Sequence, residues 1–349
     1  MIYYTLFFLL MTYSFFSFFK VKKNVITLEI IIVCFIGILL TGFRDGIGND
    51  YQAYVTIYNR TANFDLLDFS GQIEPGFNLL ICVLKLLSLS PQSLFVITSF
   101  FIVVGLVDIC KKYDLRFFPL IILFVYCRLF FYFNLNVLRQ AIASVIIYYG
   151  LYSSSKYRRL FSIIAAMFFH ISAILLLPLP LLLEIRNKKT IKFIIFISII
   201  GVFLNCNGTM IIKFISAFLY VPKFVLYKDN MTTVSSIFML KGLYLKYFCI
   251  YYLYKLHDDE TARKLLILLI YSMFILAMTF AFGEIFNRLM LYFELYMIFS
   301  FVKIIKYNKG KLTNYIVIPF LYFYYFSAMR TFIMQWEAYL VPFKFYKLF

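Results

Sequence analysis

Five short polar groups hold the side chains of this sequence that are best suited to chemistry. The first group follows an apolar segment and combines Arg44, Asp50, Tyr51 and Tyr54 with closely spaced glycines. Glycine permits tight turns and close backbone approach, so we expect this turn to present its side chains to the outer surface. Asp50 would stay ionised near arginines and could accept a proton. The alternative is a polar turn in which Asp50 only caps the next helix.

The next two groups each place a charge at an expected helix start. Glu74 precedes Pro75 and Gly76; proline fixes a first helical turn, and the glutamate can complement the helix dipole. Glu74 is therefore either a second candidate base or only a cap. Arg139, with Gln140 beside it, is suited to a bidentate grip on phosphate oxygens. Its alternative is an arginine that extends its charge to a membrane interface.

The last two groups lie later in the chain. His170, followed by Ser172, interrupts an apolar run, and it is either a third candidate base or an ordinary core histidine. Arg288 and Tyr292 are separated by one i,i+4 step of a helix, so both can face one cavity. The alternative for this pair is an interfacial helix start.

The surrounding chain indicates what must position these groups. Of its 349 residues, 64% are hydrophobic and only 14% are charged, whereas soluble domains are roughly 45 to 50% apolar and about 25% charged. Apolar runs of about 17 to 25 residues have the length of a membrane-crossing helix. Runs such as 265–282 are apolar on every face, unlike barrel strands. The composition excludes a soluble enzyme and predicts an all-α, polytopic membrane helix bundle with a single transmembrane domain, 1–349.

The net charge of +18 is interpreted as a topology signal. Because basic residues mark cytoplasmic loops, we expect no nucleic-acid partner. The six cysteines lie in or beside apolar runs and read as buried small hydrophobes. The sequence contains no Asp-x-Asp pair, HExxH motif or Cys/His cluster. We therefore expect neither a metal nor a cofactor.

Six basic clusters, placed together in the cytoplasm, determine the predicted topology. The N-terminus then lies outside, together with the long loops 44–74 and 207–236. A last crossing at 312–326 leaves the tail 330–349 outside or at the membrane interface. The six clusters cover residues 20–23, 111–116, 156–159, 186–192, 255–264 and 303–311.

If all six clusters lie in the cytoplasm, an even number of crossings must separate each neighbouring pair. Two intervals between the clusters contain an odd number of apolar runs. We expect 75–90 to dip into the outer leaflet without crossing, and 160–183 to form two half-helices that break near His170. The total is then about 10 to 13 membrane segments. The competing interpretation is that one basic cluster lies outside.

Together, the five groups resemble the EpsG-like branch of Wzy-type polysaccharide polymerases, which polymerise O-antigen, capsule or exopolysaccharide repeat units. The resemblance covers about residues 40 to 300. Its motifs are Arg-x-Gly-x-Gly-x-Asp-Tyr-x-x-Tyr at 44–54, Glu-Pro-Gly-Phe at 74–77, Asn-x-x-Arg-Gln at 136–140, Phe-His-x-Ser-Ala at 169–173 and Asn-Arg at 287–288.

This resemblance implies a GT-C-like glycosyltransferase on the outer face of the bacterial inner membrane. Such enzymes transfer a growing glycan from undecaprenyl diphosphate to the next lipid-linked repeat unit, so the implied partners are this lipid-linked oligosaccharide as donor and acceptor, membrane lipid and a chain-length regulator protein. Arg44, Arg139 and Arg288 would bind the diphosphate. The expected substrate contacts also include Gln140, Tyr51, Tyr54 and Tyr292.

The base is ranked Asp50, then Glu74, then His170, because the first two lie on the expected acceptor face. Three alternative functions remain open. An O-antigen ligase would use the same donor with a lipid A core acceptor. A flippase or transporter would also need a basic cavity, although its site should lie near the midplane. A membrane O-acyltransferase has only His170 in its favour.

Overall fold

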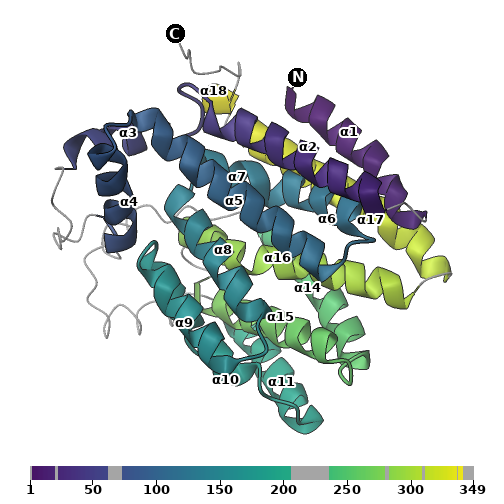
Figure 1. Cartoon of the computed structure of the whole chain (residues 1–349). Coiled ribbons are helices and arrows are strands. Elements are labelled where there is room, and N and C mark those ends of the chain that lie inside the picture. Colours follow the sequence, from purple (N-terminus) through teal and green to yellow (C-terminus); the bar gives the residue numbers. More distant parts are fainter. Residues whose placement is uncertain are drawn as a thin grey trace. The chain divides into compact units, whose positions relative to one another are not determined.

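The computed structural model describes residues 2–19, 23–61, 73–205, 236–279, 283–308, 311–335 and 337–340. Within these ranges the regular structure is entirely helical, which confirms the all-α prediction. The chain divides into two compact units, Met1–Leu177 with Leu312–Phe349, and Pro178–Lys311 (Figure 1). This division does not test whether residues 1–349 form a single transmembrane domain, which stays a prediction.

The first unit joins the N-terminal half of the chain to its C-terminal helices. Its elements in order are α1 Ile2–Ser14, η1 Phe15–Phe18, α2 Lys23–Gly42, α3 Tyr51–Arg60, α4 Pro75–Leu86, α5 Pro91–Tyr113, α6 Phe118–Val125, η2 Tyr126–Phe130, α7 Phe131–Leu135, α8 Leu138–Tyr152, α9 Lys156–Met167, η3 Ile171–Leu176, α17 Leu312–Gln335 and α18 Glu337–Leu340.

The core of this unit is the continuous span formed by α6, η2 and α7. This segment is apolar apart from Arg128 and Asn134, and 89% of it is buried, as expected for a helix surrounded by others. Helix α1 packs on α6, α17 packs on η2, and α5 packs on α2, α6 and α8. The central segment η2 is a π-helix rather than an α-helix.

Four helices of the described residues are long and apolar enough to cross a membrane: Asn24–Gly42, Pro91–Tyr113, Phe118–Leu135 and Asn314–Gln335. The shortest has 18 residues, or about 27 Å at 1.5 Å per residue, close to the hydrocarbon thickness of a bilayer. These lengths fit a multi-pass membrane protein. The larger predicted number of segments and their orientation stay predictions.

The segments 75–90 and 160–183, which the sequence predicts to deviate from a simple crossing helix, are irregular in the structure. Helix α4 has 12 residues, or about 18 Å, which is too short to cross. In the second segment α9 ends at Met167 and η3 begins at Ile171, so the predicted break near His170 is confirmed. The end predicted for the last crossing, residue 326, is wrong, because no helix breaker follows it and α17 continues through Gln335. The first residues of the predicted tail are therefore helical.

The second unit is a separate helical cluster around α15, which packs against α11, α14 and α16. Loop 207–236, predicted to be extracytoplasmic, lies outside the described residues except for Ser236, where α14 begins. The unit's elements are α10 Leu179–Leu182, α11 Lys188–Asn205, α14 Ser236–Lys255, α15 Glu260–Thr279 and α16 Gly283–Tyr307.

Candidate functional site

Arg44 lies in the interior of the first unit, just beyond the end of α2. Its side chain is fully buried, and Nη1 donates to the carbonyl oxygens of Thr41, at 3.0 Å, and Asn134. The guanidinium carbon lies 4.7 Å from the centre of the Phe95 ring and 6.0 Å from that of Tyr51, within cation–π range. Burial lowers the pKa of the guanidinium to about 9, so Arg44 remains charged at neutral pH.

The expectation that this first group presents its side chains at the protein surface is wrong for three of its residues, whereas the membrane face on which the turn lies stays a prediction. Tyr51 and Tyr54 are buried together with Arg44, because backbone carbonyls and ring faces supply the contacts that water would otherwise make. Tyr51 stacks on Phe95 with the ring centres 4.5 Å apart. These side chains therefore order the turn from within.

Gly48 permits the turn to lie directly against the end of α7. Its φ is +105°, and a Cβ atom here would be 2.2 Å from the carbonyl oxygen of Leu135. The next residue, Asn49, donates its backbone N–H to Oδ1 of Asn136 at 3.2 Å. The first and third polar groups are thus joined by a hydrogen bond from the Asn49 backbone to the Asn136 side chain.

Gln92 is a residue that the sequence reasoning missed. From the first turn of α5, its Nε2 donates to the carbonyl oxygens of Gly42, at 2.5 Å, and Arg44, at 3.2 Å. Its Oε1 accepts a hydrogen bond from the Tyr51 hydroxyl at 3.2 Å. The available signal in the sequence was an amide side chain directly after Pro91, at the start of an apolar run.

Asp50 occupies the N-cap position of α3, but its side chain makes no capping hydrogen bond. Its Oδ1 accepts from Nδ2 of Asn49 at 3.4 Å, and its charge interacts with Arg44. The carboxylate is half-buried. This geometry argues against the capping alternative, since a cap is defined by a bond to the first backbone N–H groups.

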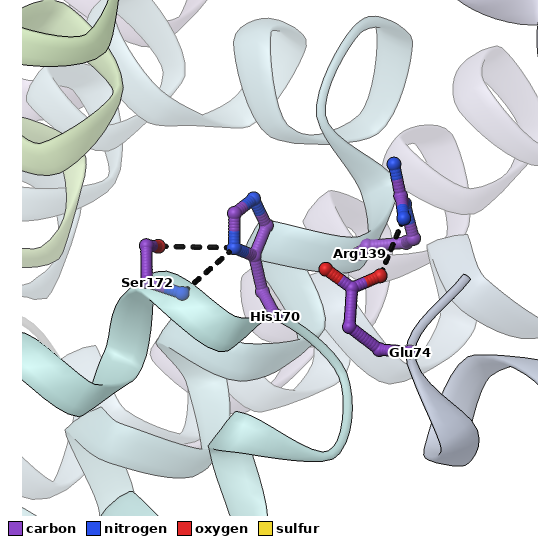
Figure 2. A network of polar contacts seen from close by, with 4 residues as sticks. All are labelled: Glu74, Arg139, His170 and Ser172. Carbon is purple, nitrogen blue, oxygen red and sulfur yellow. Dashed lines mark hydrogen bonds and ion pairs between the residues drawn. The ribbon is translucent and has the colours of Figure 1, made fainter. Parts of the chain in front are cut away.

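Glu74 and Arg139 form an ion pair between the start of α4 and the first turn of α8 (Figure 2). Glu74 stands at the N-cap position without making a capping hydrogen bond, because its carboxylate is directed to the guanidinium. The two side chains are 14% and 27% exposed, so the pair is partly shielded from solvent. Tyr54 also hydrogen-bonds Arg139.

Gly76 fixes the start of α4 against the end of α9. Its N–H donates to the carbonyl oxygen of Phe168 at 2.7 Å, and a Cβ atom at this position would lie 2.8 Å from that oxygen. Only a residue without a side chain fits this contact. The Glu-Pro-Gly motif is therefore held next to the break that contains His170.

His170 accepts hydrogen bonds at Nδ1 from Ser172, whose backbone N–H is 3.3 Å away and whose hydroxyl is 3.0 Å away. Figure 2 shows the imidazole near the Glu74–Arg139 pair. Because a backbone N–H donates to Nδ1, the neutral ring carries its proton on Nε2. In this tautomer His170 donates a hydrogen bond through Nε2 and is suited to an anionic oxygen.

The remaining predicted residues belong to α8 and to the second unit. Gln140 is buried on α8, next to Arg139. Arg288 and Tyr292 belong to α16 of the second unit; Arg288 is half-buried, and Tyr292 is only 1% exposed. Their grouping with Arg139 stays a prediction. Within the described ranges, no group of three or more His, Cys, Asp or Glu residues could hold a metal ion.

Comparison with known proteins gives a family match. A family model described as the EpsG family matches residues 27–345, a range that contains all five polar groups. The chain matches none of the curated proteins and none of the solved structures.

Proposed function

The chain belongs to the EpsG family, the family of Wzy-type polysaccharide polymerases, and from this membership we propose that it polymerises lipid-linked glycan repeat units. The match over residues 27–345 carries the proposal. The donor would be a growing glycan on undecaprenyl diphosphate, and the acceptor would be the next lipid-linked repeat unit. We place the reaction on the extracytoplasmic face of the bacterial inner membrane, with a chain-length regulator as an expected partner.

The proposed reaction is a glycosyl transfer. An acceptor hydroxyl oxygen forms a bond to the anomeric carbon of the donor glycan, and the bond from that carbon to the diphosphate breaks. The hydroxyl proton passes to a base, and the leaving electron pair stays on undecaprenyl diphosphate. Because the diphosphate is already a good leaving group, the protein's tasks are to stabilise its charge, align the hydroxyl and accept one proton.

Arg139 is the arginine of the first unit best placed to receive the diphosphate. Its guanidinium is partly exposed and already binds an anion, the Glu74 carboxylate. A diphosphate carries more negative charge and offers a matching pair of oxygens. We propose that it takes the place of Glu74 on Arg139 and that Nε2 of His170 donates to the same anion.

Asp50 is the proposed base. It is half-buried, and its charge interacts with that of Arg44. Glu74, once released from Arg139, is the second candidate. Since Arg44 is buried and held by two carbonyl oxygens, we assign it to ordering this turn and to the local positive potential. Arg288 stays a proposed diphosphate ligand from the second unit.

The experiment that tests this function uses the purified full chain in lipid nanodiscs with an undecaprenyl-diphosphate-linked repeat unit. A ladder of lengthened lipid-linked glycans on a gel is the expected product. Transfer only to an added lipid A core would identify a ligase, and an unchanged lipid that moves between leaflets would identify a transporter. Nanodiscs without protein provide the background.

A further inference from the structure

A pocket with almost entirely apolar walls lies inside the first unit. Helices α1, α2 and α5 form its sides, and the α6–η2 segment forms its floor. Gly37 lets the Phe130 ring and the Val103 side chain pack closely against α2, since a Cβ atom there would lie 3.0 Å from both. The lining residues are Leu6, Leu10, Val33, Ile36, Gly37, Leu40, Val103, Leu106, Val107, Ile122, Val125, Tyr126 and Phe130. We call this pocket the α1–α2 slot.

The α1–α2 slot lies between α1 and α2, which pack against different helices of the unit. Helix α1 packs on α6, whereas α2 packs on α5, and both run along the same side of the unit (Figure 1). On the α2 side, Ile36 both lines the slot and is 36% exposed. A chain-like ligand could therefore enter sideways from the bilayer without leaving an apolar environment.

The floor of the slot is the π-helical segment Tyr126–Phe130. Tyr126 and Phe130, the first and last residues of this segment, both line the slot, and the Tyr126 hydroxyl donates to the Tyr3 carbonyl oxygen at 2.9 Å. Single π-helical turns are rare and occur frequently at functional sites. The π-helical turn thus places two aromatic rings, those of Tyr126 and Phe130, on the face that lines the slot.

One end of the slot lies close to Arg44, which does not line it. Leu40 precedes Arg44 by four residues, and Phe130 precedes Asn134, whose carbonyl oxygen binds Arg44, by the same number. Nε and Nη2 of Arg44 are buried, and no acceptor for them exists among the described residues. From residue 33 to residue 40 the slot runs about 10 Å along α2. An apolar channel that ends near a guanidinium is complementary to a long apolar chain with an anionic head.

We propose that the α1–α2 slot binds a segment of the isoprenoid chain of a lipid-linked substrate, with the diphosphate toward the Arg44 end. This inference rests on the proposed function, which supplies a polyprenyl-linked substrate. Burial of branched apolar units would supply affinity. The chain would also be oriented so that its head group lies at the level of the polar residues.

The test uses full-length protein in nanodiscs and a polyprenyl phosphate that carries a photoreactive diazirine in its first isoprene units. Labelled peptides are identified by mass spectrometry. We expect labels on α2 around Ile36 and on the Tyr126–Phe130 segment, and we expect unlabelled polyprenyl diphosphate, but not excess phosphatidylglycerol, to compete. Labelling elsewhere, or equal competition by phosphatidylglycerol, would overturn the proposal.

A matched pair of variants on one helix provides the second measurement. Ile36→Trp places a large ring in the slot, whereas Ile32→Trp makes the same change at a 45%-exposed residue that does not line it. Ile36→Trp should raise KM for the lipid-linked unit by about tenfold and reduce labelling equally; Ile32→Trp should change neither. Equal effects of the two variants would contradict the slot.

The two proposals fail in distinguishable ways. Wild-type protein that labels in the slot but makes no ladder contradicts the polymerase function and leaves the slot as a polyprenyl site. Wild-type protein that makes a ladder without labelling in the slot contradicts only the slot.

Discussion

Arg44 and Arg139 differ in what neutralises their charge. The Arg44 guanidinium lies between ring faces and carbonyl oxygens, whereas Arg139 is held by one carboxylate, that of Glu74. A carboxylate can be exchanged for another anion, but backbone carbonyls cannot leave without unfolding the turn. The sequence predicts the same role, diphosphate binding, for both arginines. Only their contacts with distant parts of the chain distinguish the two.

Arg139→Lys should reduce polymerisation by at least about tenfold, because charge-assisted hydrogen bonds contribute about 1.5 to 3 kcal/mol and lysine lacks the planar fork. The measurement is ladder formation by purified protein at equal membrane insertion. Arg60→Lys is the control, since Arg60 is exposed at the end of α3. Normal chain length in Arg139→Lys would remove Arg139 from the diphosphate site.

Asp50→Asn should reduce the rate of transfer by about 100-fold or more, the contribution typical of a general base. Asp50 makes no capping hydrogen bond, and asparagine has nearly the same shape as aspartate, so folding should not change. Asp45→Asn makes the same substitution at an exposed position of the same turn and should leave the ladder intact. If Asp50→Asn polymerises like wild type, the role of base passes to Glu74.

At the scale of elements, the sequence predicts the individual segments well. It predicts the contacts between segments less well. The apolar runs, the short α4 and the break at His170 follow from composition, proline and length. The contacts that join the motifs, such as Gly76 with the Phe168 carbonyl or Gln92 with Gly42, involve backbone atoms. Every residue has such atoms, so the side-chain pattern gives no signal for them.

Gly48→Ala tests the contact between the polar turn and α7. The change should lower the free energy of unfolding by about 2 kcal/mol or more, because it adds strain at positive φ and a clash with the Leu135 carbonyl. Gly46 also has positive φ, +65°, but nothing lies within 4 Å of its Cβ position. Gly46→Ala should cost only about 1 kcal/mol.

Thermal unfolding of the two glycine variants in detergent, followed by tyrosine fluorescence, would measure this difference. Gly48→Ala should also lose ladder formation, since its turn carries Asp50. Equal melting temperatures for the two variants would show that the close approach to Leu135 does not stabilise the fold.

At the scale of the whole molecule, the two compact units divide the predicted site. The first unit holds Arg44, Asp50, Glu74, Arg139 and His170, and the second holds Arg288 and Tyr292. A family match that spans residues 27–345 includes both units. We therefore expect the reaction to need the intact chain.

The predicted topology places the turn after α2, and with it the candidate site, outside the cytoplasm. In a cysteine-free background, Thr61→Cys at the end of α3 should react with a membrane-impermeant maleimide in intact cells. Ser154→Cys is the matched control, because Ser154 is exposed between α8 and α9 and lies beside a basic cluster that should face the cytoplasm. It should react only after permeabilisation. Labelling of Ser154→Cys but not Thr61→Cys in intact cells would invert the topology, place Asp50 and Arg139 on the cytoplasmic face, and contradict a reaction on the extracytoplasmic side.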